Sequence, residues 1–134
     1  MSIFVKDDDV VNVEVHYVEE NGNIDVLEQP SDKSVTLKIK FRRPDFSISQ
    51  RLVASSTTLD QSGNPSVNLL MLQNNMLYFL AKDWDVRELD TKNEAGEVIK
   101  GKAVEMNAEN IGNLRVEIAR AMLAKLIPAI GQII

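Results

Sequence analysis

The sequence predicts an α+β fold, with a small N-terminal antiparallel β-sheet followed by three helices and a loop or hairpin before the last helix. Between residues 10 and 42, apolar and polar residues alternate, as in half-buried strands. Between residues 45 and 127, apolar residues recur at three- and four-residue steps, as on one face of a helix. With 134 residues and no cysteine, the chain fits one domain that needs no disulfide.

Two strands have the clearest alternation. Apolar residues occupy every second position of residues 10–18 and of residues 34–42, and polar residues occupy the positions between them. Asn21-Gly22 predicts a turn, and residues 24–27 are a short third candidate. We therefore expect one antiparallel sheet with a wet face. The acidic residues 1–9 that precede it are expected to be flexible.

The wet face of the second strand is basic, through Lys38, Lys40 and Arg42, and Arg43 follows directly. Glu14 of the first strand could pair with these residues across the sheet, which is worth roughly 0.2–1 kcal/mol per pair. A charged outer face explains the pattern, and the alternative is an electrostatic docking site for an acidic partner. The net charge of −5 argues against nucleic-acid binding.

Local signals place the first two helices. Ser47 and Gln50 have the spacing of a capping box, so a helix should start near Ser47. Asn64 as N-cap and Pro65 as first helical residue predict a second helix over about residues 65–82. This second helix is apolar on most of its circumference, which is typical of a central helix or of one that packs against another chain.

The segment that follows the second helix holds the only tryptophan, Trp84. We expect Trp84 to be a core anchor at a helix end that packs on the final helix. Residues 86–104 predict a loop or small hairpin, with Val98 and Ile99 as its apolar anchors. Asn107 should cap the last helix and Pro128 should end it, which leaves residues 128–134 as an apolar tail.

Few residues carry chemistry. His16 is the only histidine, and it projects from a polar strand position, as an ordinary surface histidine would. No cluster of residues has the spacing of a catalytic, cofactor-binding or metal-binding motif. The sequence contains no stretch that reads as a membrane span. We therefore expect no enzyme activity, no cofactor and no metal, and look for the function in contacts with other proteins.

Three short runs carry a resemblance to a family. They are Trp84-Asp85-Val86, then Asn93-Glu94-Ala95-Gly96-Glu97-Val98, then Asn107-Ala108-Glu109-Asn110-Ile111 with Leu114, and Arg42-Arg43-Pro44 lies upstream. In this order they resemble the tail assembly chaperones and small accessory tail proteins of long-tailed bacteriophages.

That resemblance implies a non-enzymatic protein that binds the tape-measure or tail-tube protein in the host bacterial cytoplasm. The alternative role is a structural baseplate or tail-completion protein that stays in the virion tail. Neither nucleic acid nor a membrane is expected as a partner, and whether copies of the chain associate stays open.

Apolar residues of the second helix and of the tail are the candidates for partner binding: Leu69, Leu72, Met76, Ile130, Ile133 and Ile134. For the helix, the competing interpretation is that these side chains form the core. A hypothesis of another class is a small enzyme or ligand-binding domain with a site near Trp84, for which Asp83, Asp85 and His16 are the available groups.

Overall fold

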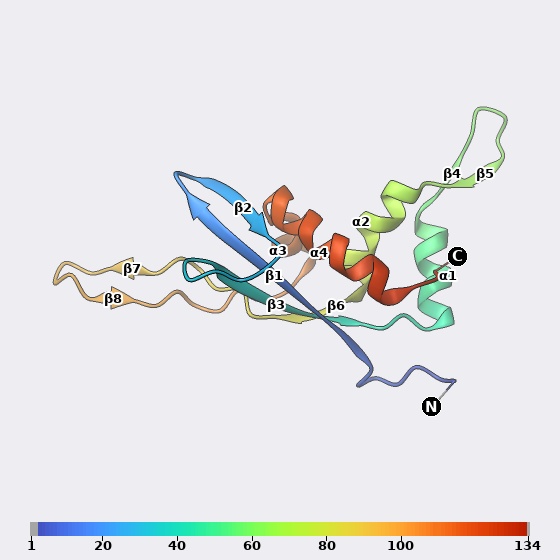
Figure 1. Cartoon of the computed structure of the whole chain (residues 1–134). Coiled ribbons are helices and arrows are strands. Elements are labelled where there is room, and N and C mark those ends of the chain that lie inside the picture. Colours follow the sequence, from blue (N-terminus) through green and yellow to red (C-terminus); the bar gives the residue numbers. More distant parts are fainter. Residues whose placement is uncertain (1–2, 134) are drawn as a thin grey trace.

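The computed structural model describes residues 3–133 and confirms the α+β class. Its main sheet has four antiparallel strands in the order β2-β1-β3-β6 (Figure 1). These strands are β1 (Val10–Glu20), β2 (Asn23–Leu27), β3 (Val35–Arg42) and β6 (Ala81–Trp84). Two small hairpins pair β4 (Thr57–Leu59) with β5 (Pro65–Val67), and β7 (Thr91–Lys92) with β8 (Val98–Ile99). Within the described residues there are four helices: α1 (Phe46–Ser55), α2 (Leu69–Leu80), α3 (Ala108–Gly112) and α4 (Val116–Ile130).

The two strands with regular alternation are confirmed, and they pair with each other. In the β1–β3 register, Val13 lies opposite Ile39 and Glu14 lies opposite Lys38. The predicted Asn21-Gly22 turn joins β1 to β2. Five of the inward side chains are buried, namely Val11, Val13, Val15, Ile39 and Phe41, so over these positions the alternation separates a core face from a wet face.

The core lies between this sheet and the helices. α4 lies along β1 and also contacts α2, and Figure 1 shows α2 and α4 beside the main sheet. Side chains from every layer are fully buried there, among them Phe41, Leu52, Leu80, Met122 and Leu126. The buried apolar side chains of the described chain form one contiguous cluster.

The first helix begins at Phe46, next to the expected Ser47, whereas the second begins at Leu69 and not at about residue 65. Asp45, not Ser47, caps α1 by accepting a hydrogen bond from the Ile48 backbone N–H at 2.8 Å. Pro65 begins β5, a strand position that needs no backbone donor. Asn68 then caps α2. It directly precedes the apolar residues that begin at Leu69, whereas Asn64 lies before β5.

The last predicted helix is broken in two. Asn107 caps α3 as expected, but the helix stops at Gly112 and resumes at Val116, since glycine and the following Asn113 are poor helix formers. Pro128 does not end α4. It lies inside the last turn, and the helix ends at Gly131, whose φ of 82° is open to glycine at little cost.

Trp84 lies on β6, the fourth strand of the sheet, and not at a helix end. It pairs with Ile39 of β3. Its side chain is partly buried against the core, where it borders a small gap together with Leu114 and Met122. A four-residue strand directly after a helix has too short an alternation to be recognised in the sequence.

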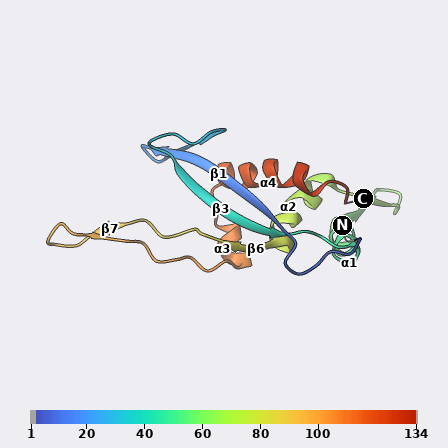
Figure 2. The ribbon, with the colours of Figure 1, turned by 60° about the horizontal axis from the view of Figure 1, so that its bottom comes forward.

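Residues 86–104 form the expected hairpin, which we call the arm. It projects away from the body in both views (Figures 1 and 2). Its presumed anchors are exposed instead: Val98 by 61% and Ile99 by 51% of their surface. Gly101 braces the base, because a Cβ at that position would lie 1.6 Å from the Glu88 carbonyl oxygen. Only glycine permits the two strands to approach so closely.

The first and the last segment of the described chain both contact the rest of the domain. In the acidic N-terminal segment, the Asp9 carboxylate accepts a hydrogen bond from Arg43 at 3.1 Å, and the Asp7 carbonyl accepts one from Lys82 at 2.8 Å. In the apolar tail, Ile130 and Ile133 pack against the core and are partly buried. Both segments are therefore attached to the domain at named points.

Candidate functional site

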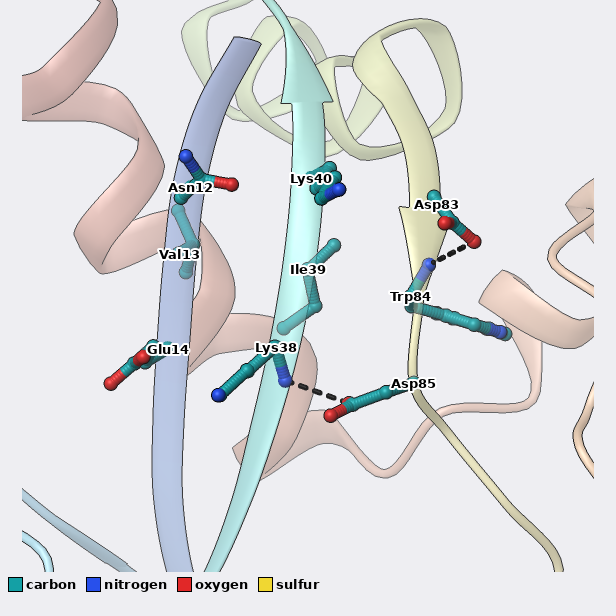
Figure 3. A pocket seen from close by; sticks show the side chains of 9 residues that line it. All are labelled: Asn12, Val13, Glu14, Lys38, Ile39, Lys40, Asp83, Trp84 and Asp85. Atoms are coloured by element: carbon teal, nitrogen blue, oxygen red, sulfur yellow. Dashed lines mark hydrogen bonds between the residues drawn. The ribbon is translucent and has the colours of Figure 1, made fainter.

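A groove crosses the wet face of the sheet beside Trp84. It has a volume of about 330 Å³ and is lined by residues of three strands and of the segment after β6. Figure 3 shows the lining side chains. The polar ones are Asn12 and Glu14 from β1, Lys38 and Lys40 from β3, and Asp83 and Asp85.

Both aspartates of the groove already hold backbone groups. The Asp85 carboxylate accepts a hydrogen bond from the Lys38 backbone N–H at 2.7 Å, and the Asp85 N–H donates back to the Lys38 carbonyl at 3.1 Å. The Asp83 carboxylate accepts from the Trp84 backbone N–H at 2.9 Å (Figure 3). These bonds satisfy the edge of β3 and β6 where the strand pairing stops, which is a structural role for the two carboxylates.

The hypothesis of a site near Trp84 grouped Asp83, Asp85 and His16, and the structure does not bring all three together. Asp83 and Asp85 line the groove, but His16 does not. The Trp84 ring points away from the groove's polar side chains (Figure 3), and its Nε1 donates to the Val104 carbonyl at 2.8 Å. Trp84 therefore joins the end of the arm to the sheet.

His16 is buried, so its interpretation as a surface histidine was wrong. Only 7% of its surface is exposed, and its Nδ1 lies 2.8 Å from the Thr36 hydroxyl of β3. Its Nε2 is 3.9 Å from the Glu14 carboxylate. A polar side chain can be buried on the outer face of a strand when its neighbours on both adjacent strands cover it, and Leu27 and Thr36 occupy those positions.

The four basic residues proposed as a docking site fall into two pairs. Lys38 and Lys40 are exposed and line the groove. Arg42 instead pairs with Asp45 at 3.3 Å. Arg43 pairs with Asp9 and also donates to the carbonyl of Ala129 at 3.4 Å. The arginines thus join segments of the chain to one another, and only the two lysines remain as a positively charged contact.

The six apolar candidates also divide. Leu69 is 62% exposed, whereas Leu72 and Met76 are in the core, with Leu72 exposed by 6%. These two side chains are out of reach of a partner unless the domain opens. Ile130 and Ile133 are partly buried, and Ile134 lies outside the described residues.

Two exposed neighbours of Leu69 were missed, namely Leu70 and Met71 in the first turn of α2. We call Leu69, Leu70 and Met71 the α2 apolar turn. The signal for it was present, because four consecutive apolar residues, ending with Leu72, cannot all face one side of a helix. The sequence showed an excess of apolar residues, and only the tertiary structure shows which of them the core leaves out.

Other features of a chemical site are few. Among residues 3–133, no three histidine, aspartate or glutamate side chains are arranged to hold a metal ion. Burial raises the pKa of Tyr17 above its ordinary value of 10.0, and the nearby Glu19 carboxylate raises it further. Tyr17 packs against the core, so this shift reflects the packing of β1.

Comparisons with models of protein families, with curated proteins and with solved structures find no match to this chain. Within the part of the chain that the structure describes, no helix is both long enough and apolar enough to cross a membrane.

Proposed function

We propose that this protein is a non-enzymatic tail assembly chaperone of a long-tailed bacteriophage, which binds the tape-measure or tail-tube protein by apolar contacts in the host cytoplasm. The observation that supports this function is the α2 apolar turn, where Leu69, Leu70 and Met71 are all exposed. Three adjacent apolar side chains on the surface of one helical turn favour a protein-contact role. The resemblance of the Trp84 and Asn107 segments supplies the kind of partner.

The α2 apolar turn is held in place for such a contact. Asn68 caps the helix by accepting a hydrogen bond from the Met71 backbone N–H at 3.0 Å. The next turns are fixed in the core through Leu72 and Met76. A partner therefore meets apolar side chains on an ordered backbone, and binding costs less conformational entropy than it would on a flexible loop. Fully burying one leucine side chain contributes about 1.5–3 kcal/mol.

Co-expression tests the proposal. The chain is produced together with the tape-measure protein, or with the tail-tube protein, of the same phage, and the soluble fraction of that protein is measured with and without the chain. We expect a larger soluble fraction and a stable complex on gel filtration. No association with either protein, and no change in their solubility, would refute the chaperone role.

A triple substitution locates the contact. Leu69→Ser, Leu70→Ser and Met71→Ser together should abolish the solubility gain while the chain itself stays folded. Val116→Ser is the matched control, because Val116 is an exposed apolar residue on the first turn of another helix. A baseplate or tail-completion protein is the alternative in the same class. It differs in one observable, since such a protein would be found in purified virions and a chaperone would not.

The groove beside Trp84 supports a second candidate, a small ligand-binding domain. It combines two lysine ammonium groups with carboxylates in a hollow of about 330 Å³, which is the lower end of the size range of ligand pockets. An NMR screen of small charged metabolites would test it. Shifts confined to the amides of Asn12, Lys40 and Asp83 would support a ligand site, and a screen without such shifts would remove it.

A further inference from the structure

Two β-edges of this protein lie toward the same end of the molecule. β2 is the outermost strand of the main sheet, and β8 pairs only with β7 in the described chain. Figures 1 and 2 both show the β1–β2 turn and the arm extending in one direction. Each strand has backbone N–H and C=O groups on one side that no strand of the described chain pairs, and such an edge is a template for another strand.

The β2 edge lacks two of the residue types that commonly protect an edge strand from pairing. Asn23–Leu27 contains no lysine and no proline, the residues that commonly prevent strand addition. Val26 on this strand is exposed. Between residues 17 and 32 the chain carries five acidic residues and no lysine or arginine. Acidic residues therefore predominate along this segment, and Arg115 reaches only its turn, where it donates to the Gly22 carbonyl at 2.6 Å.

The β8 edge is complementary in both respects. Residues 98–103 carry Lys100 and Lys102 and no acidic residue. Val98 and Ile99 expose more than half of their surface. The arm is also an ordered structure, because Gly101 donates its N–H to the Asp90 carboxylate at 2.8 Å and accepts a hydrogen bond from Arg87 at 3.0 Å. The two apolar residues of β8 and the two lysines that follow it are thus exposed on an ordered arm.

We propose that two copies of this chain form a dimer in which the β8 strand of each adds to the β2 edge of the other. Both elements lie toward the same end of one molecule, so a twofold axis at that end allows the two contacts to form together and closes the assembly at two copies. Backbone hydrogen bonds provide the pairing. Lys100 and Lys102, placed along the acidic Asp25 and Glu28, set its orientation.

Sedimentation velocity over a range of protein concentrations tests the dimer. We expect the wild-type chain to dimerise, and the variant Lys100→Glu/Lys102→Glu to weaken the dimer by about tenfold or more in Kd, because like charges then face each other. The control Lys6→Glu/Lys125→Glu makes the same change in net charge at exposed positions on other parts of the surface, and it should leave the Kd unchanged. Circular dichroism checks that each variant is folded.

A charge swap makes the test specific for these two strands. Asp25→Lys/Glu28→Lys alone should also weaken the dimer, whereas a mixture of this variant with Lys100→Glu/Lys102→Glu should form a heterodimer, since opposite charges again meet at both contacts. A monomeric wild type, or variants that dimerise as the wild type does, would overturn the proposal. So would a dimer that Leu69→Ser breaks and the lysine variant leaves intact. The dimer does not depend on the chaperone role, and the co-expression experiment can fail without affecting it.

Discussion

Leu69 and Leu72 lie three residues apart on α2, and truncating them should change the free energy of unfolding by very different amounts. Leu72 is 6% exposed and belongs to the core, so Leu72→Ala removes buried apolar surface and leaves a cavity. Such substitutions lower the free energy of unfolding by about 2–5 kcal/mol. That is a large part of the roughly 5–15 kcal/mol that stabilises a domain, and it corresponds to a fall in melting temperature on the order of 10 °C. Leu69 is 62% exposed, and Leu69→Ala should change the free energy of unfolding by about 0.5 kcal/mol or less.

Urea denaturation followed by circular dichroism measures both effects. The Leu72→Ala midpoint should move to clearly lower urea with an unchanged slope, and the Leu69→Ala curve should overlay the wild type. Both variants lose the same atoms from the same helix, so helix propensity cancels between them. Equal destabilisation by the two substitutions would refute the orientation of α2, and with it the assignment of Leu69 to a contact surface.

Three further substitutions probe the arm, the sheet edge and β1. Gly101→Ala should speed amide exchange at Glu88, measured by NMR, because the new Cβ collides with the Glu88 carbonyl oxygen. The urea midpoint should hardly change, since the arm adds nothing to the core, and unchanged exchange would contradict the brace. Trp84→Phe leaves the Val104 carbonyl without its 2.8 Å indole bond and should cost about 1–3 kcal/mol in urea denaturation, while no loss would make that bond dispensable. The pKa of Tyr17 is raised in the folded state, so folding loses stability as the pH rises above about 10. Tyr17→Phe should therefore lose less stability than the wild type between about pH 9 and pH 11, and equal losses would contradict the shift.

The β1–β3 part of the sheet could be predicted from the sequence because its signal is repeated. Seven alternating residues in β1 and eight in β3 place Val13 and Ile39 on one side whatever the partner strand is. The strands that sequence reasoning missed, β4, β5 and β6, have three or four residues. β5 shows the physical reason, because Asn64-Pro65 suits a helix start and a strand start equally. Only its pairing with Thr57–Leu59 decides between them.

The exposed apolar residues of α2 were predictable by type and not by position. Apolar excess along α2 was visible, but whether Leu69 or Leu72 is exposed depends on where the helix leaves the core. His16 illustrates the same gap, since alternation places it on the wet face, and the burial of that position by Leu27 and Thr36 is a tertiary fact. Arg42 and Arg43 look like a surface patch in the sequence, yet partners at Asp45 and Asp9 engage both of them.

The two proposed contact surfaces, the α2 apolar turn and the arm, are attached to the domain in different ways. Substitutions can therefore test them separately. The α2 apolar turn continues a helix that the core holds through Leu72 and Met76, so it cannot move without cost to the whole domain. The arm is joined to the body at its base, where Trp84 binds the Val104 carbonyl and Gly101 keeps the strands together. Changing the arm should therefore alter association and leave stability intact. If copies pair through the arm, the α2 apolar turn of each stays available, and one dimer would present two sites for apolar segments of a tail protein.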